Sequence, residues 1–583
     1  MAAFLKAYVD CRSSEERENG GIQENSKSLD FETSHPTWYS FETGIYQSKY
    51  PSINLPSEPF LDVVSFIFSE RHNGIQALID SSSGLTVSHP KLHSLVKSMA
   101  SGLHSIGVTQ GDVILILLPN SVCFPVVFLG ALSIGAIVTT MNPLSSLLEI
   151  KTQILDSNAS LIFTVFGRVD ELVSELRGCR VIGVPEVLDI NIKSMPNDDG
   201  SVFHKLIFSD PNLAPRPKIM QQDVASILYS SGTTGRAKGV MLTHRNFISM
   251  VELCMRFEAS LYDYPPAENV YLAVVPMFHV YGLSLFVMGL LSLGCTIVTM
   301  SKFDVDEMVK AIRRYGVTHL HVVPPLLTAL TRRVKRDGND SCRSLRQVSC
   351  GAAPLSQRSI HEFCETLPHV DFIQGYGMTE SSAVGTRGHN TVEVRKYSSV
   401  GLLSPNVEAK VVDWVTGSHL SPGSVGELWL HTPGNMKGYL NNIEATMAAL
   451  DKDGWLHTGD IVYFDQEGYL YVIDRLKEII KYKGFQVAPA DLEAVLMSHP
   501  DVLDAAVMGA RDEEAGEIPV AFVVLRDGSS VSQADVMDYV AKQVAPYKKV
   551  RKVFFRATIP RSAAGKILRR ELRRSLLSSS SRL

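Results

Sequence analysis

The sequence SILYSSGTTGRAKGVMLT, residues 226–243, decides how this chain is interpreted. It starts as a short apolar strand, turns at Ser230 through a run of glycine, serine and threonine, and continues into Lys238-Gly239. Glycines let the backbone turn tightly and direct its N–H groups at an anion, hydroxyl groups add donors, and lysine adds charge. This composition predicts a phosphate-binding loop, with an ordinary flexible connection as the alternative. No Gly-Lys-Ser/Thr closes the loop, so it differs from the P-loop of NTPases.

Continuous apolar runs lie on both sides of this loop. Residues 113–118 read VILILL and stop at Pro119-Asn120, as a strand buried on both faces would. Residues 295–300, 320–323 and 521–525 have the same pattern, with helical stretches between the runs. This alternation predicts an α/β fold with parallel, doubly wound sheets, whose ligands bind outside the carboxyl ends of the strands.

A boundary is predicted near Asp474-Arg475. Residues 468–473 (GYLYVI) alternate as a strand, and a new unit with its own helix at 490–497 follows. We expect a large N-terminal body of doubly wound sheets plus a β-subdomain, and a small, mobile α+β C-terminal domain. The predicted parts are an N-terminal tail and lead-in segment (1–54), the large body (55–474), the small domain (475–575) and a serine-rich tail (576–583).

Composition limits the class of protein. The chain has 583 residues, roughly four folding units at ~150 residues each. It is 45% hydrophobic and 20% charged, which excludes a mostly disordered or collagen-like chain. The net charge of -5 argues against nucleic-acid binding by bulk positive charge. Residues 475–583 carry 19 Lys and Arg against 13 Asp and Glu, so this end has a net charge of +6 and suits an anionic ligand.

Neither the cysteines nor the apolar runs indicate a secreted or membrane protein. The eight cysteines form no CxxC pair and lie in apolar segments, which favours reduced, buried thiols. The most apolar run, residues 124–138, contains two glycines and a proline and is shorter than the roughly 20 residues that a spanning helix needs. We interpret it as a buried helix leading into a strand, and we expect no membrane span and no secretory signal.

Five further motifs follow the loop in order: PMFH at 276–279, QGYGMTE at 374–380, TGD at 458–460, DR at 474–475 with the lysines up to Phe485, and PRS at 560–562 with Gly565-Lys566. Together they resemble the signature of the acyl-adenylate-forming, AMP-binding superfamily, over roughly residues 55–575. That superfamily includes acyl-CoA synthetases, peptide-synthetase adenylation domains and firefly luciferase. The closest resemblance is to plant 4-coumarate:CoA ligases and their peroxisomal ligase-like relatives.

The chemistry of such a ligase needs a cation between two anions. A carboxylate attacks the α-phosphate of ATP, giving an acyl-adenylate and pyrophosphate, and the acyl group then passes to CoA. Because carboxylate and phosphate repel each other, a positive group must hold both. The resemblance implies this role for Lys566, with further catalytic roles for His279, which gates the acyl site, and Lys481. For Lys566 the alternative is a solvated lysine in a basic run.

The resemblance also implies a nucleotide site. Asp460 is acceptor-only and suits two ribose hydroxyls, Tyr376 offers a flat face to adenine, and Glu380 is an oxygen ligand suited to Mg²⁺. The implied ATP- and AMP-binding residues are Ser230, Ser231, Gly232, Thr233, Thr234, Lys238, Gln374, Gly375, Tyr376, Thr379, Asp460, Arg475 and Lys566.

The acyl and CoA sites are implied in the same way. The acyl or adenylate contacts are Tyr281, Gly351, Ala352, Lys477, Lys481 and Gln486, and the CoA contacts are Lys302, Lys483 and Gly484. A solvated charge run is the alternative for these lysines. The family's small domain rotates about the segment that matches Asp474-Arg475, so that one site serves both half-reactions. His319 and His321 share a strand face without a third zinc ligand, and we expect both to be packing residues.

Two details bear on substrate and location. Residues 381–388, SSAVGTRG, are shorter and more polar than the apolar stretch of true 4-coumarate ligases, which favours fatty-acid-like acids of the jasmonate-precursor type. Ser581-Arg582-Leu583 resembles the peroxisomal address Ser-Lys-Leu, so an import receptor is an expected partner. The prediction is an ATP- and Mg²⁺-dependent carboxylate–CoA ligase of peroxisomes. The alternatives are 4-coumarate:CoA ligase proper, a luciferase-like monooxygenase and an inactive binding protein.

Overall fold

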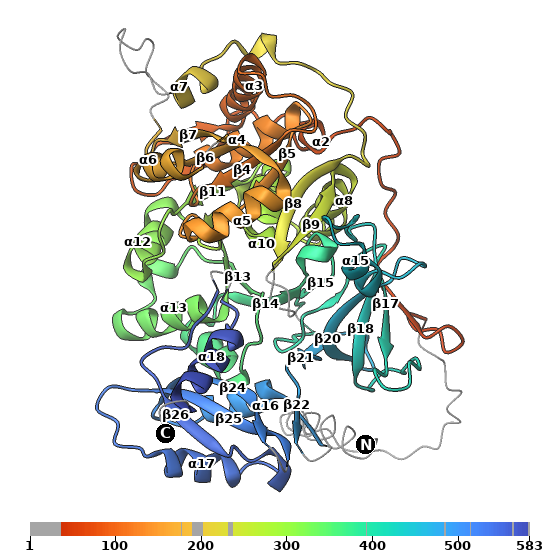
Figure 1. Ribbon diagram of the computed structural model, residues 1–583, viewed down its shortest axis with the longest axis vertical. Coiled ribbons are helices and arrows are strands. Elements are labelled where there is room, and N and C mark those ends of the chain that lie inside the picture. The colour runs from red at the N-terminus through yellow and green to blue at the C-terminus, as the bar shows by residue number, and fades with distance from the viewer. Residues whose placement is uncertain are drawn as a thin grey trace.

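The computed structural model describes residues 37–176, 178–188, 202–230, 237–391, 393–482, 485–512, 515–562 and 565–580. The first 36 residues of the predicted N-terminal tail and lead-in segment, and the tripeptide 581–583, therefore lie outside the described residues. Four sheets carry the fold, three in the large body and one in the small domain at the C-terminal end (Figure 1). The α/β prediction, with a large body and a small C-terminal domain, is confirmed.

A seven-stranded sheet holds the predicted loop. Its order is β19-β9-β8-β5-β4-β6-β7, and the strands from β8 to β7 are parallel. Every residue of β4 is buried, as its apolar run predicts. The apolar run 124–138 forms helix α4 and then β5, as expected. The strands are β4 (Val113–Leu117), β5 (Ile137–Thr140), β6 (Ala159–Val165), β7 (Arg180–Val184), β8 (Val224–Ser230), β9 (Lys238–Thr243) and β19 (Gly438–Tyr439), and helices α3 (His89–Ser105), α4 (Cys123–Ser133) and α5 (Leu147–Ser157) accompany them.

A nine-stranded sheet forms the second layer, in the order β16-β15-β14-β13-β12-β10-β11-β2-β3. Helix α12 (Val305–Tyr315) covers part of it. That helix begins at Asp304, whose carboxylate caps two N–H groups, and ends at Gly316, which has a left-handed φ of 62°. The strands are β2 (Gln76–Asp80), β3 (Thr86–Ser88), β10 (Val270–Ala273), β11 (Thr296–Thr299), β12 (His319–Val322), β13 (Gln347–Cys350), β14 (Asp371–Tyr376), β15 (Thr386–Arg387) and β16 (Leu402–Leu403), and the other long helices are α13 (Pro324–Asp337) and α14 (Gln357–Thr366).

An antiparallel five-stranded sheet completes the large body. It consists of β1 (Ile45–Gln47), β17 (Glu408–Val412), β18 (Gly426–His431), β20 (Leu456–Phe464) and β21 (Leu470–Arg475). Strand β1 pairs with β17, so part of the predicted lead-in segment belongs to this sheet. Tyr46 in β1 is fully buried and stacks on Phe464 with ring centroids 4.3 Å apart. This packing ties the start of the described chain to the β-subdomain.

The small domain is built on β22 (Ile480–Tyr482), β23 (Phe485–Val487), β24 (Val502–Asp512), β25 (Gly516–Leu525) and β26 (Lys552–Phe555), with helices α16 (Pro489–Met497), α17 (Gln533–Ala541) and α18 (Arg569–Ser580). Residues 521–525, interpreted above as a strand of a parallel sheet, lie in β25, which pairs antiparallel with β24 and parallel with β26. The parallel assignment therefore holds on one side of the strand only, because a short apolar run shows burial on both faces but not the direction of each partner. Helix α18 continues to Ser580, into the predicted tail.

The small domain packs against the large body. Arg358 of α14 donates to the carbonyl oxygens of Met497 and Ser498, at 3.3 and 2.9 Å. Gly565 has φ +77°, and a Cβ there would lie 3.1 Å from the Val323 side chain at the end of β12. This turn therefore favours glycine for its conformation and for its close approach. The contact carries Lys566, the next residue, to the large body.

Cysteines and apolar helices agree with the expectations. All seven cysteines in the described part of the chain are free, and four of them are buried. None of the described helices combines the length and the hydropathy needed to cross a membrane.

Candidate active site

A carboxylate held from two sides forms the centre of the site. The antiparallel register of β20 and β21 places Asp460 opposite Arg475, whose Nε lies 3.1 Å from Asp460 Oδ1. Tyr376, at the end of β14, donates its hydroxyl to Asp460 Oδ2 at 2.7 Å. Burial and Asp460 raise the pKa of Tyr376 well above its ordinary value, so the phenol stays protonated. Each carboxylate oxygen has one such partner and keeps a lone pair for a ligand hydroxyl.

Lys566 enters this centre from the small domain. Burial lowers the pKa of Lys566, and Arg475 lowers it further, whereas Asp460 and Glu380 act in the opposite direction. A short hairpin holds the residue: the Ser562 N–H donates to the Lys566 carbonyl at 2.8 Å, and the Arg561 guanidinium donates to the Gly565 carbonyl at 3.0 Å. The structure thus brings the predicted lysine to the predicted carboxylates across the domain boundary.

Glu380 belongs to a second group of contacts, and here the sequence interpretation missed a residue. Tyr439 donates its hydroxyl to Glu380 Oε1 at 2.9 Å, and the Lys238 ammonium lies 4.8 Å from the centroid of the Tyr439 ring. Strand β19 pairs with β9, where Val240 is opposite Tyr439. No motif marks a tyrosine 59 positions after Glu380, so only the pairing of β19 with β9 reveals it.

Glu380 can contribute to a magnesium site. It is 7% exposed, and its carboxylate is the only hard anion in this group of contacts among the described residues. No cluster of three or more metal-ligating side chains occurs in the part of the chain that the structure describes. An ion here would therefore take most of its ligands from substrate phosphates and water, which is how Mg²⁺ is usually bound.

His279 and Tyr281, which are predicted to lie at the acyl site, contact each other. The His279 Nδ1 accepts the Tyr281 N–H at 3.4 Å and caps the short helix α10 (Val280–Gly282). Burial, and secondarily Lys566, lowers the pKa of His279 to about 4, so the imidazole is neutral. At Gly351 a Cβ would lie 3.4 Å from the Gly375 carbonyl and 3.7 Å from the Tyr281 ring. The three predicted acyl-site residues therefore meet.

His319 and His321 were expected to be packing residues. Both are buried, but both also take part in polar contacts, which that expectation did not include. Tyr264 Oη lies 3.4 Å from His319 Nε2, and Tyr281 Oη lies 3.1 Å from His321 Nδ1. A short alternating strand pattern shows that two side chains share a face but not which groups cover that face.

The remaining predicted site residues have no described contact with the centre at Asp460. The Gln374 side chain donates to the Tyr397 carbonyl at 2.7 Å, Thr379 is buried, and Ala352 has a left-handed φ of 69°. Lys302, Lys477 and Lys481 are exposed, and the described contacts around Asp460 do not include them. Ser230 ends β8 with its hydroxyl buried and without a partner in the described chain. Outside the described residues lie Ser231, Gly232, Thr233, Thr234, Lys483 and Gly484, and the Gln486 side chain is likewise not described.

Comparison with known proteins identifies the family. Residues 67–440 match the family described as AMP-binding enzyme, and residues 491–566 match the AMP-binding enzyme C-terminal domain. The chain is 57% identical to 4-coumarate--CoA ligase-like 6 of Arabidopsis thaliana, over 95% of this chain and 98% of that protein. It is 44% identical to Peroxisomal OPC-8:0-CoA ligase 1 of the same plant, over 90% and 95%.

Solved structures agree in fold. ATP-bound MatB from Rhodopseudomonas palustris superposes with a TM-score of 0.79 at 26% identity, over 88% of this chain and 98% of that chain. MenE from Bacillus subtilis, an o-succinylbenzoate CoA synthetase in complex with ATP and magnesium, gives a TM-score of 0.73 at 27% identity, over 87% and 99%. The chain therefore belongs to the AMP-binding enzyme family, as an acid–thiol ligase of the 4-coumarate–CoA ligase-like group.

Proposed function

We propose that this acyl-CoA ligase works through an acyl-adenylate and uses Lys566 to hold the substrate carboxylate against the α-phosphate of ATP. The observation that carries the proposal is the position of this half-buried small-domain lysine in the field of Asp460, Glu380 and Arg475, all on the large body. An ammonium ion costs free energy to bury without compensation. Two anions, a carboxylate and a phosphate, would supply that compensation when the substrates bind.

The nucleotide has matching groups around the same centre. Asp460 would accept the ribose hydroxyls, because Arg475 and Tyr376 fix its carboxylate and leave lone pairs available. Tyr376 would face adenine, together with Gln374, Gly375 and Thr379. Lys238, with Ser230 and the loop Ser231–Thr234, would bind the phosphates. Mg²⁺ would be held by Glu380 and would neutralise phosphate charge. Tyr439 would orient that carboxylate through its hydroxyl.

For the second half-reaction we propose a rotation of the small domain about Asp474-Arg475. Asp474 accepts the Arg475 N–H at 2.7 Å with one oxygen and the Ala490 N–H at 2.9 Å with the other, so it joins β21 to the start of α16. Rotation would withdraw Lys566 and bring Lys477, Lys481 and Gln486 toward the adenylate. Lys302, Lys483 and Gly484 would then contact CoA. The exposure of Lys302, Lys477 and Lys481 in the present pose suits residues that act in another.

The proposed substrates are fatty-acid-like acids of the jasmonate-precursor type, or acids of the hydroxycinnamate type. The 44% identity to a protein named as an OPC-8:0-CoA ligase supports the first group. The polar stretch 381–388 supports it too, because it does not provide an apolar wall for an aromatic ring. The same relative is named as peroxisomal, and the C-terminal tripeptide Ser581-Arg582-Leu583 suits import by a peroxisomal receptor.

The test is a substrate panel with the purified full-length chain, ATP, Mg²⁺ and CoA. Hydroxycinnamates, fatty acids and cyclopentanone-bearing acids are compared by pyrophosphate release and by mass spectrometry of the acyl-CoA. We expect thioester formation from at least one class, with acyl-AMP accumulating when CoA is omitted. Pyrophosphate release without any thioester, or light emission without CoA, would contradict the proposal.

A further inference from the structure

The nine-stranded sheet has an unusual polar surface beside the acyl site. Strand pairing places Tyr271 next to His319, and His319 next to Gln347, in one row across β10, β12 and β13. His321 and Ser349 form the next row. The two histidines, Gln347 and Ser349 are all less than 5% exposed. Central strands of such sheets are normally apolar on both faces, and a buried polar group costs free energy unless it is hydrogen-bonded. The buried polar side chains of these two rows therefore need hydrogen-bonding partners.

A chain of contacts connects this surface to the acyl site. Arg387 is paired with Gly375 across β14 and β15, and its Nη2 lies 3.4 Å from His321 Nε2. A guanidinium can only donate, so Nε2 accepts and the hydrogen of His321 is on Nδ1, directed at Tyr281 Oη 3.1 Å away. This arrangement leaves the hydroxyl hydrogen of Tyr281 to donate to another acceptor. Tyr281 also borders Gly351, so the contacts start where the acyl chain would pass.

Arg387 also forms an ion pair that is neutral overall. Its Nε lies 2.6 Å from Glu258 Oε2. Burial lowers the pKa of His321 well below its ordinary value and that of His319 to about 3, so both rings are uncharged. Burial also raises the pKa of Tyr281. The compartment thus offers hydrogen-bond donors without net charge.

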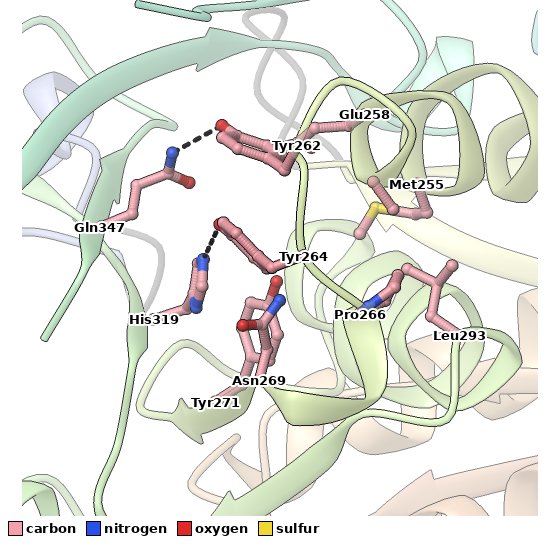
Figure 2. Close-up of a pocket in the computed structure, with 11 residues that line it drawn as sticks. Met255, Glu258, Tyr262, Tyr264, Pro266, Asn269, Tyr271, Leu293, His319 and Gln347 are labelled. Atoms are coloured by element: carbon pink, nitrogen blue, oxygen red, sulfur yellow. Dashed lines mark hydrogen bonds between the residues drawn. The ribbon is translucent and has the colours of Figure 1, made fainter. Parts of the chain in front are cut away.

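Glu258 also lines a small cavity (Figure 2). Its volume is about 20 Å³, enough for one water-sized group. Gln347 and His319 point from β13 and β12 toward Tyr262 and Tyr264, with contacts of 2.7 and 3.4 Å. Asn269 lines the cavity, is 5% exposed, and its Oδ1 has no partner in the part of the chain described. This cavity beside Glu258 therefore has space for one water-sized group and, among the described residues, one unused acceptor, which suits a hydroxyl.

We propose that Arg387 is a specificity-determining residue that receives a neutral oxygen function, a hydroxyl or a ketone, on the distal part of the acyl chain. Glu258 and His321 position its guanidinium. From Gly351 to Gln347 the strand runs four residues, about 13 Å at ~3.3 Å per residue, which is the distance along β13 between the predicted acyl contact and the cavity beside Glu258. A second carboxylate is disfavoured, because Glu258 already compensates Arg387 and the added charge would be buried unpaired. The inference rests on the proposed ligase function and names its substrate class.

The first test needs only the wild-type chain. Decanoate is compared with a series of hydroxydecanoates and oxodecanoates in which the oxygen moves one carbon at a time, and kcat/KM is measured for acyl-CoA formation. We expect one or two positions to exceed decanoate by about tenfold to a hundredfold, the effect of one hydrogen bond to a charged group. Decanedioate should be converted less well than decanoate. A flat series, or a preference for decanoate throughout, overturns the inference.

The second test removes the ion pair. Arg387→Met combined with Glu258→Leu removes both charges, so neither is left buried alone. The preference for the best oxygenated acid over decanoate should fall to less than threefold, while Arg395→Met, at an exposed arginine, keeps the wild-type preference. A double variant with the wild-type preference overturns the role of Arg387. Absence of thioester from every acid with wild-type protein would instead overturn the proposed function itself.

Discussion

Lys566→Ala should separate the two half-reactions. The ammonium is the group that the small domain adds to the site, and Arg475 cannot replace it, because its Nε is held 3.1 Å from Asp460 Oδ1. Removing one preorganised charge stabiliser costs about 10²–10³ in rate, or roughly 3–4 kcal/mol. We therefore expect pyrophosphate release from ATP and acid to fall by that factor. Thioester formation from supplied acyl-AMP and CoA should fall far less, since the proposed rotation withdraws Lys566 in that step.

The assay measures the two half-reactions on the same preparations. Pyrophosphate release is followed with ATP, Mg²⁺ and acid, and acyl-CoA formation is followed with synthetic acyl-AMP and CoA. Lys542→Ala is the matched control, because Lys542 is an exposed lysine of the same domain. An equal loss in both half-reactions, or wild-type pyrophosphate release, would refute the assigned role of Lys566.

The same residue predicts a pH dependence. Burial and Arg475 lower the pKa of Lys566, so the free enzyme loses this ammonium at a lower pH than an ordinary lysine would. Because the adenylating step needs the charged form, kcat/KM for pyrophosphate release should decline on the alkaline side, below pH ~10.5. Lys566→Ala should lack this decline. An alkaline limb of unchanged position in the variant would assign the decline to another group.

Four further predictions concern other parts of the chain. Burial raises the pKa of Asp474 to about 7, so the folded protein binds a proton that the unfolded chain has lost, and stability falls as pH rises from about 4 to 7. The Tm of Asp474→Asn relative to wild type should accordingly rise between pH 5 and 7 and level off above. Tyr439→Phe should raise the Mg²⁺ concentration needed for half-maximal pyrophosphate release severalfold, whereas an unchanged requirement would separate Tyr439 from the metal site. Lys483→Glu should spare pyrophosphate release and raise KM for CoA, and unchanged CoA kinetics would remove that assignment. A fluorescent reporter fused ahead of the chain should become cytosolic when residues 581–583 are deleted, and continued peroxisomal import would contradict the address.

Several parts of the fold follow from local pattern alone. The run at 113–118 is apolar at every position, and it forms β4 with every residue buried. The interrupted run 124–138 is too short for a membrane span and forms α4 and β5 instead. These predictions hold because burial on both faces leaves a continuous apolar pattern that few other structures produce. Strand direction was not predictable in this way, as β25 shows, because it depends on which partner the strand meets.

In the candidate site, too, some residues were predictable from the sequence and others were not. Motif order placed Lys566, Asp460, Arg475 and Tyr376 in one function, and the structure brings these four side chains to one place. Tyr439 was missed, because its hydroxyl reaches Glu380 only after β19 pairs with β9. The polar role of His321 was also missed, since it requires Arg387 from β15 and Tyr281 from α10 to meet over β12.

The sequence by itself determined the ligase family of this protein, because its motifs are choices of residue type in a fixed order. It also determined the separation of an acidic body from a basic C-terminal unit, since charge is a property of composition. Only the tertiary structure decided that Lys566 comes into the field of Asp460 and Glu380, and that His321 meets both Tyr281 and Arg387. Those arrangements depend on strand pairing and domain packing between residues hundreds of positions apart, and local pattern carries no record of such contacts.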